Sequence, residues 1–335
     1  MKRYALIGLF AIAASTLLAQ DIHYSQFYNS PLNVNPANTG VFNGDKRLNL
    51  SYRRQWSSVP VPWTTFSGSY DRKFYPKKDK NHFFSGGILF NYDREGNITK
   101  LNLSNFNVTG SFTSILNENN LITLGALIGY STRGFSLTGL TWDKQWDGTS
   151  FDPTIDPGEN FQSRRVSFLD LGIGANYRWQ KSKRTKVDLG VGLLHLQEPG
   201  VAFVSGDDIS LPRRLTLSGV GSFKVASKID LQLQALGQFQ GESDEFVFGG
   251  LGKFYVSQRR GDEVEVHLGA GYRTSKSVFP ILAIQYKQFY GAVSYDIDLS
   301  DFSDLHQRPA ALELHFSYII ADVRPFKRAK VCPIF

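Results

Sequence analysis

The sequence predicts an all-β protein, a transmembrane antiparallel β-barrel of about 14 strands with short periplasmic turns and long extracellular loops. Three observations predict this fold. Apolar and polar residues alternate at period two along most of the chain, Tyr and Trp gather near the ends of the alternating stretches, and the connections alternate in length. Apolar residues make up 41% of the chain, which argues against a disordered protein.

The alternation is clearest in the stretch IDLQLQALGQFQ, residues 229–240. Leu231 and Leu233 fall on one face of this stretch, and Gln232 and Gln234 fall on the other. A strand between lipid and a water-filled lumen requires two such faces. The stretches EVEVHLGAGYR and LELHF repeat the pattern. The residues expected to face lipid therefore include Leu231, Leu233, Val266 and Leu314.

Fourteen stretches carry such a pattern and are the expected strands. One of them changes the phase of its alternation near Asn105, which predicts a β-bulge there. The expected bounds are 46–55, 63–74, 82–93, 98–115, 120–132, 165–179, 184–197, 213–225, 228–240, 245–257, 263–273, 278–287, 289–298 and 309–320.

A soluble β-sandwich also alternates, but two features favour the barrel. Most of the stretches run ten residues or more, whereas strands in soluble proteins average about five or six. Aromatic residues at stretch ends are typical of the girdles that sit at membrane interfaces. The aromatic residues in such positions are Tyr52, Trp56, Trp63, Tyr92, Trp142, Trp179, Tyr255 and Tyr272.

The two ends of the chain predict further segments. Residues 1–19 have the pattern of a signal peptide, with Lys2 and Arg3 before an apolar run and cleavage expected after Ala19. The run is shorter than the roughly 20 apolar residues of a membrane-spanning helix. The expected organisation is a signal peptide at 1–19, a periplasmic N-terminal segment and possible plug at 20–43, the outer-membrane barrel at 44–320 and a periplasmic C-terminal tail at 321–335.

Connection length and charge predict an orientation. The longest connections, near 133–163, 197–212 and 298–307, are all odd-numbered, which places them outside the cell and the short turns in the periplasm. An even strand count then places both termini on the periplasmic side. The short turns are basic, as in QKSKRTK, and the long loops are acidic. This separation of charge has two interpretations. The charges either keep the exposed turns and loops soluble, or they let the basic periplasmic face dock on an acidic protein partner or on anionic lipid headgroups.

Motifs of catalysis are missing from the sequence, since no phosphate-binding loop, HExxH or GxSxG is found. His267 and His315 each follow a glutamate by two residues, which allows a metal or acid–base site, but ordinary polar packing in the lumen is the favoured interpretation. The two Asp-Pro pairs of 152–157 favour rigid turns over a calcium site. Neither nucleic acid nor a cofactor is expected, and Cys332 is expected to be a packed residue.

The residues near the ends carry a family resemblance. The successive segments DIHYSQFYNSPLNVNPANTG and YRRQW, with the terminal CPIF, resemble the PorP/SprF family of type IX secretion system outer-membrane proteins. The resemblance covers the chain from residue 20 to residue 335. Ile334 departs from the usual terminal form, in which a charged or polar residue follows Cys-Pro.

The resemblance implies a non-enzymatic outer-membrane barrel of the type IX secretion and gliding machinery. Such a barrel would support export or surface attachment of a secreted, adhesin-like protein by docking its C-terminal sorting domain. The implied partners are that substrate protein, a periplasmic peptidoglycan-binding lipoprotein and outer-membrane lipid. The alternative function is a passive porin or small-solute transporter, and a barrel hydrolase or acyltransferase is the least favoured class.

The hypothesis for partner binding joins the family-like motifs to the basic turn. The expected docking surface is the periplasmic face made of residues 20–43, the basic turn 181–186 and the tail 324–335, although a structural role is favoured over direct partner contact for the individual residues of the N-terminal motif. The residues in the hypothesis are Ser25, Gln26, Phe27, Asn35, Pro36, Ala37, Gly40, Gln55, Trp56, Lys183, Arg184, Lys186, Cys332 and Pro333.

Overall fold

A computed structural model describes most of the chain. The described residues are 21–56, 61–76, 81–97, 100–136, 141–156, 158, 164–204, 208–259, 261–299 and 310–321. The expected signal peptide, Cys332, Pro333 and nearly all of the expected C-terminal tail lie outside these residues. No helix among the described residues is long and apolar enough to cross a membrane.

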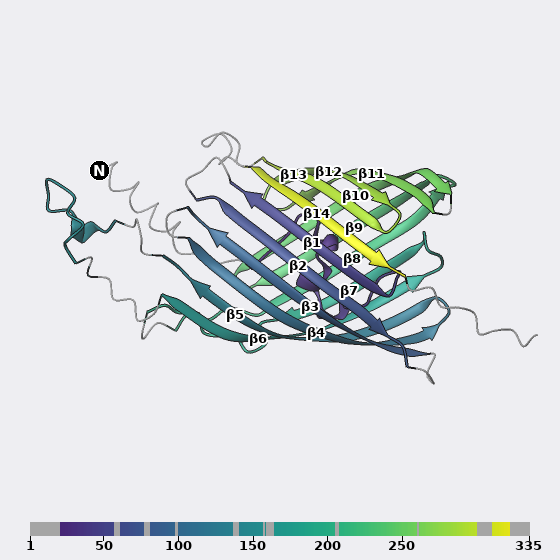
Figure 1. Ribbon diagram of the computed structural model, residues 1–335, viewed down its shortest axis with the longest axis horizontal. Coiled ribbons are helices and arrows are strands. Elements are labelled where there is room, and N and C mark those ends of the chain that lie inside the picture. Colours follow the sequence, from purple (N-terminus) through teal and green to yellow (C-terminus); the bar gives the residue numbers. More distant parts are fainter. Residues whose placement is uncertain are drawn as a thin grey trace, which may run out of the picture.

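The described residues form a closed antiparallel barrel in which each strand pairs with its neighbours in sequence and β1 pairs with β14 (Figure 1). The strands are β1 (Lys46–Gln55), β2 (Trp63–Phe74), β3 (His82–Glu95), β4 (Leu101–Asn117), β5 (Asn120–Gly134), β6 (Arg165–Gln180), β7 (Lys186–Leu194), β8 (Arg214–Ala226), β9 (Ile229–Gln240), β10 (Ser243–Arg259), β11 (Asp262–Arg273), β12 (Ser277–Tyr286), β13 (Phe289–Asp298) and β14 (Ala310–Ile320).

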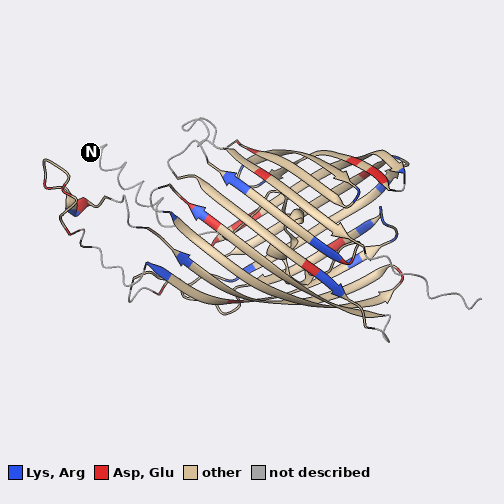
Figure 2. Ribbon diagram, in the orientation of Figure 1, with Lys and Arg blue, Asp and Glu red and all other residues tan. Residues whose placement is uncertain are grey.

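The predicted fold class is confirmed, and each strand overlaps one predicted stretch. The bounds of β1, β2 and β13 agree with the prediction at both ends. The alternation determines this result because one face of each strand must meet lipid and the other the lumen. Leu231, Leu233 and Leu314 are exposed on the outside of the barrel. In Figure 2 the middle parts of most strands carry few charged residues.

The predicted β-bulge near Asn105 is wrong. The register of β4 runs without a shift from Leu101 to Ser114 against β3, and the irregularity against β5 falls between Ile115 and Asn117. The phase of the hydrophobic pattern changes because Leu103 faces the lumen, where it lines a small pocket of mixed apolar and polar residues that includes Leu32. Along β4 the side chains that face the lumen change from apolar to polar, whereas the backbone pairing with β3 stays regular.

The two ends of the barrel differ in their connections. The even-numbered connections, such as those between β6 and β7 or β8 and β9, lie at one end, here named the short-turn end. The strand ends that the longest connections join, on either side of 135–164, 195–213 and 299–309, lie at the other end, here named the long-loop end. In Figure 1 the long-loop end is on the left and the short-turn end on the right. Which end faces the periplasm stays a prediction.

Three short helical turns lie inside the barrel, where they appear in purple in Figure 1. They are η2 (Phe27–Asn29), α2 (Pro31–Val34) and η3 (Pro36–Asn38). Proline starts both α2 and η3, at the position where its missing N–H costs no hydrogen bond. A fourth turn, η4 (Asp143–Gln145), lies in the connection between β5 and β6.

Candidate functional site

The segment 21–43 crosses the lumen from one end to the other. Its first residue, Asp21, donates a backbone hydrogen bond of 3.3 Å to Gln240, which ends β9 at the long-loop end. At its other end, the backbone N–H of Asp45 donates to the carbonyl of Ile320 at the short-turn end, over 2.7 Å. The segment therefore runs through the lumen rather than lying only at the short-turn side, where it was expected. Its start, Asp21, lies at the long-loop end, so the expectation that both ends of the mature chain lie at the short-turn side is wrong for this end of the described chain.

Ser25 lies at the centre of a buried ionic cluster. Its backbone N–H donates to Glu313 over 2.6 Å, and its hydroxyl donates to Asp296 over 2.6 Å. The same hydroxyl accepts hydrogen bonds from Arg53 at 3.0 Å and from Arg273 at 2.7 Å. Arg53 also pairs with both Glu313 and Asp296. A serine from the segment thus completes a charge network supplied by four wall strands, β1, β11, β13 and β14.

Gln26 extends this cluster. Its backbone N–H donates to Glu313 over 3.1 Å, and its side-chain amide donates to Ser294 over 2.8 Å. Both Ser25 and Gln26 are fully buried. Charge-assisted hydrogen bonds of this kind are about twice as strong as neutral ones. The family-like residues therefore hold the segment in the lumen, and no partner outside the barrel reaches them in this conformation.

Asp21 anchors the segment at the long-loop end. Its carboxylate lies 2.7 Å from Nε2 of His195 and 2.9 Å from Arg214. Nδ1 of His195 lies 2.9 Å from Asp170 on β6. Burial alone would lower the pKa of His195, but the Asp21 carboxylate and hydrogen bonds to both aspartates raise it to about 9. Burial opposes ionisation of Asp21 too, yet Arg214 and His195 hold its pKa well below the usual range.

The Asn35-Pro36-Ala37 motif packs against glycines of the wall. The Asn35 side chain accepts a hydrogen bond from the N–H of Ala37 over 2.8 Å and donates to the carbonyl of Ala175 over 2.9 Å. A Cβ added at Gly125 on β5 would come within 2.5 Å of the Ala37 backbone, and one at Gly174 within 1.9 Å of Asn35. Glycine allows this close approach of segment and wall.

Gly40 closes the motif with a backbone conformation that favours glycine. Its φ is +77°, and its N–H donates to Asp71 over 2.7 Å. A Cβ there would also clash with Ser85. Asp71 in turn accepts two hydrogen bonds from Arg47, of 2.9 and 2.8 Å. Gly40 therefore lets the chain turn toward β1 beside a buried ion pair.

An apolar patch of the lumen wall receives Phe27. Phe27 and Val34 pack with buried side chains of β9, β10 and β12. The sequence carried one signal of this patch that the prediction did not use. β12 is apolar on both faces, since Phe279, Ile281 and Ala283 point inward between outward apolar residues. The buried wall residues of the patch are Leu236, Val247, Leu251, Phe279 and Ile281.

The YRRQW segment lies away from the short-turn end. Gln55 ends β1 at the long-loop end and accepts a hydrogen bond from Arg53 over 3.2 Å. Trp56 follows it with a φ of +56° and contacts the ring of Trp63 edge-on, with the ring centroids 6.0 Å apart. These two residues therefore do not share a surface with the basic turn.

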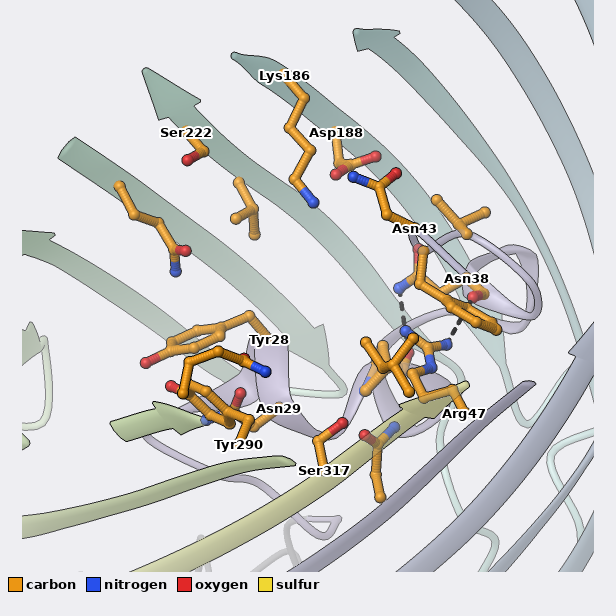
Figure 3. A pocket seen from close by; sticks show the side chains of 18 of the residues that line it. Tyr28, Asn29, Asn38, Asn43, Arg47, Lys186, Asp188, Ser222, Tyr290 and Ser317 are labelled. Atoms are coloured by element: carbon orange, nitrogen blue, oxygen red, sulfur yellow. Dashed lines mark hydrogen bonds between the residues drawn. The ribbon is translucent and has the colours of Figure 1, made fainter. Parts of the chain in front are cut away.

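Two cavities flank the segment, and no residue lines both. The short-turn vestibule has a volume of about 630 Å³ and the long-loop vestibule about 620 Å³. Tyr28, Asn43, Lys186 and Tyr290 line the first (Figure 3), whereas His23, Trp56 and Asp296 are among those lining the second. The buried cluster around Ser25 lies between them. The segment thus separates the lumen into two vestibules.

The basic turn between β6 and β7 divides into three different roles. Lys183 is exposed at the rim, and Lys186 lies within the short-turn vestibule. Arg184 binds Asp230 through Nε at 2.9 Å and Nη2 at 2.6 Å, and also donates to carbonyls of Ala226 and Ser227. Arg184 therefore joins two neighbouring short turns, and its charge is already neutralised within the barrel.

The two histidine–glutamate pairs form separate contacts. His267 lies 3.1 Å from Glu265, and His315 lies 3.2 Å from Glu313 and 2.8 Å from Ser51. Within the described ranges, no group of three or more His, Cys, Asp or Glu side chains is placed to hold a metal ion. His315 also contacts Tyr24 of the segment, whereas His267 and Glu265 line the short-turn vestibule.

The match to a known family covers nearly the whole chain and includes the buried N-terminal motif. Residues 16–318 match the model of the type IX secretion system membrane protein PorP/SprF. The chain belongs to the PorP/SprF family. Proteins of this family are outer-membrane barrels of the type IX secretion system, and the match includes Ser25, the NPANTG segment and all but the last two residues of β14. No curated protein matches the chain.

Solved structures with similar folds are barrels of low sequence identity. The toluene transporter TbuX of Ralstonia pickettii is 10% identical, with a TM-score of 0.48 over 85% of this chain and 92% of that one. A FadL homologue of Pseudomonas aeruginosa is 12% identical, with a TM-score of 0.49 over 85% and 92%. The assignment of a closed barrel to this chain follows from its own strand pairing, not from these similarities.

Proposed function

We propose that this PorP/SprF protein is a non-enzymatic docking barrel of the outer membrane. It would reach that membrane by way of a cleaved signal peptide. It would support export or surface attachment of a secreted, adhesin-like protein by receiving its C-terminal sorting domain, together with a periplasmic peptidoglycan-binding lipoprotein. The barrel offers its two ends to these partners and is not a route for solutes.

The observation that carries this proposal is the closure of the lumen by the chain's own segment 21–43. The segment is held by ion pairs at its start and by the cluster around Ser25 in its middle, and Phe27 adds an apolar contact. A passive porin needs a continuous aqueous channel, and a segment anchored along the lumen interrupts such a channel. The two vestibules instead provide concave surfaces at the ends, where large partners bind.

The test is conductance of the purified protein in planar lipid bilayers. A closed docking barrel gives no steady large conductance, because the segment leaves two separate vestibules. A steady large conductance would favour the alternative, a passive porin or small-solute transporter. The fold of the same sample is checked by heat-modifiable mobility on gels, so that a silent sample is known to contain intact barrels.

The matching experiment in cells measures the partner function. A strain without this protein is compared with the parent strain for the amount of each secreted protein at the cell surface. Loss of one or more surface proteins, restored by the intact gene, is the expected result. Unchanged surface display of all of them would contradict the docking function, whatever the conductance.

A further inference from the structure

The short-turn vestibule carries an excess of positive charge. Within the described part of the chain, six basic side chains line it against three carboxylates. Low-dielectric walls concentrate the field of such charges inside a cavity. The basic residues are Arg47, Arg178, Lys183, Lys186, Lys253 and Lys287, and the acidic residues are Asp188, Glu263 and Glu265.

Internal ion pairs neutralise the two arginines and leave four lysines, of which Lys183 and Lys287 lie in turns at the rim. Arg178 binds Asp188 through two hydrogen bonds of 2.6 and 3.0 Å. Arg47 forms an ion pair with Asp71, a residue that does not itself line the vestibule. By contrast, the ammonium groups of Lys186 and Lys253 form no hydrogen bond or ion pair with any described residue, although both side chains line the cavity. Figure 3 shows the Lys186 side chain pointing into the open space.

Two partly enclosed ammonium groups without a partner are a feature that favours an anionic ligand. Each lysine is partly buried. Arg178, Lys253 and Arg47 repel the charge of Lys186 and Asp188 attracts it, while Glu265 and Asp230 attract that of Lys253 from beyond hydrogen-bond distance. Removing a charge from water without pairing it costs free energy. A carboxylate placed between the lysines would receive charge-assisted hydrogen bonds and reduce the repulsion between them.

The remaining wall of the vestibule is aromatic and apolar. Tyr28 from η2 and Tyr290 from β13 lie beside each other at one side of the cavity (Figure 3). Phe42 and Ile319 add apolar surface near the mouth. A ligand that fits this lining carries apolar or aromatic groups next to its carboxylates. The volume of about 630 Å³ is within the usual range of binding cavities, ~300–1,000 Å³.

The position of the mouth favours a peptide over a lipid. Lys183 and Lys287, in the turns after β6 and β12, lie at the rim, so the cavity opens at the short-turn end, where a chain can enter. The wall gives a lipid no lateral entry, because the hydrogen-bonded ladder continues around the fourteen described strands. The protein's own residues 324–335 contain four basic residues and no acidic one, so their charge does not suit this cavity.

We propose that the short-turn vestibule is a binding site for an acidic peptide segment of a secretion partner. Lys186 and Lys253 bind its carboxylates, and Tyr28 and Tyr290 pack against its apolar side chains. This inference rests on the proposed docking function and adds the chemistry of the ligand to it. Arg184 is not part of this site, because its charge is neutralised by Asp230 within the barrel. Lys253 takes its place among the expected docking residues.

The test uses the full-length protein in detergent and a fluorescein-labelled peptide, Glu-Phe-Glu-Phe-Glu, with a free carboxyl terminus. Fluorescence anisotropy measures its binding to the wild type and to the variant Lys186→Gln/Lys253→Gln. The double variant should bind about tenfold or more weakly, since two charge-assisted contacts are lost. Raising the salt concentration should weaken wild-type binding in the same direction.

Three controls separate this site from general attraction between charges. Lys144→Gln/Lys276→Gln removes two exposed lysines at the long-loop end and should leave binding unchanged. Lys186→Arg/Lys253→Arg keeps both charges and should retain most of the affinity. The peptide Gln-Phe-Gln-Phe-Gln amide should not bind. Heat-modifiable mobility on gels verifies that each variant is a folded barrel.

Several results would overturn the proposal. One is that the acidic peptide does not bind, and another is that both double Gln variants bind it equally. If glutarate competes for the site as strongly as the peptide binds, the site takes small carboxylates and the peptide assignment is wrong. Normal surface display of secreted proteins in cells carrying Lys186→Gln/Lys253→Gln would show that secretion does not use this site. The proposed docking function itself would fail only if deletion of the whole protein also left surface display unchanged.

Discussion

Gly125 sets how closely the N-terminal segment approaches the barrel wall. Changing Gly125→Ala places a methyl group within 2.5 Å of the Ala37 backbone, which must move. Overpacking of this kind costs ~1–3 kcal/mol. We expect the segment to loosen and steady conductance to appear in planar bilayers, with the barrel still heat-modifiable on gels.

Gly110→Ala is the matched control for this prediction. Gly110 is paired with Ala126, the residue after Gly125, and a Cβ there meets no atom within 4 Å. This variant should remain as silent as the wild type. Equal conductance from the two variants would mean that contact between Ala37 and the wall does not close the lumen.

Leu233 and Gln232 test the register of the wall. Leu233 is 49% exposed on the outer face, whereas Gln232 is 8% exposed and lines the short-turn vestibule. Arginine at mid-membrane on the lipid face costs ~2–4 kcal/mol. Leu233→Arg should therefore reduce folding into lipid vesicles, and Gln232→Arg should reduce it far less. A one-residue shift of register would reverse the two results. Gln234 is a poorer control than Gln232, because its side chain packs against Gly249.

At the scale of elements, the start of the segment 21–43 forms a pH-sensitive anchor. Asp21, Asp170 and Arg214 are the charged groups that face His195. The pKa of His195 rises from 6.5 to about 9 in the folded protein. Its contribution to stability is therefore fully present below pH 6.5 and is lost as the pH rises through 9. The contribution is on the order of 3 kcal/mol.

This anchor predicts the release of the segment at high pH. Conductance, or cleavage of the segment by added protease, should increase between pH 7 and pH 10. His195→Gln should show the released behaviour already at pH 7 and lose the dependence on pH in this range. A His195→Gln variant that keeps the wild-type pH profile would assign the transition to another group.

The strands and the segment differ in how far the sequence predicts them. Each strand was predictable because apolar residues alternate with polar ones where one face of the strand meets lipid and the other meets the lumen. The segment carries no such period, since its residues meet ionic, polar and apolar parts of the lumen in turn. Its burial could have been suspected from the inward apolar residues of β12, such as Phe279, which a water-filled lumen would not require.

At the scale of the whole molecule, the orientation in the membrane is testable with single cysteines. Thr149 lies exposed in the connection between β5 and β6, and Ser182 lies exposed in the turn between β6 and β7. In a Cys332→Ser background, a membrane-impermeant maleimide on intact cells should label Thr149→Cys and not Ser182→Cys. The opposite labelling would place the short-turn vestibule outside the cell.

The sequence by itself determined the barrel, its strands, the side chains that face lipid and the family, because these follow from local alternation and from contiguous motifs. Only the tertiary structure decided where the N-terminal motif lies and which basic residues stay available. Ser25 meets Glu313 across 288 positions of the chain, and Arg184 meets Asp230 across 46. Such pairings depend on closure of the barrel, which brings distant strands around one lumen, and no local pattern records them.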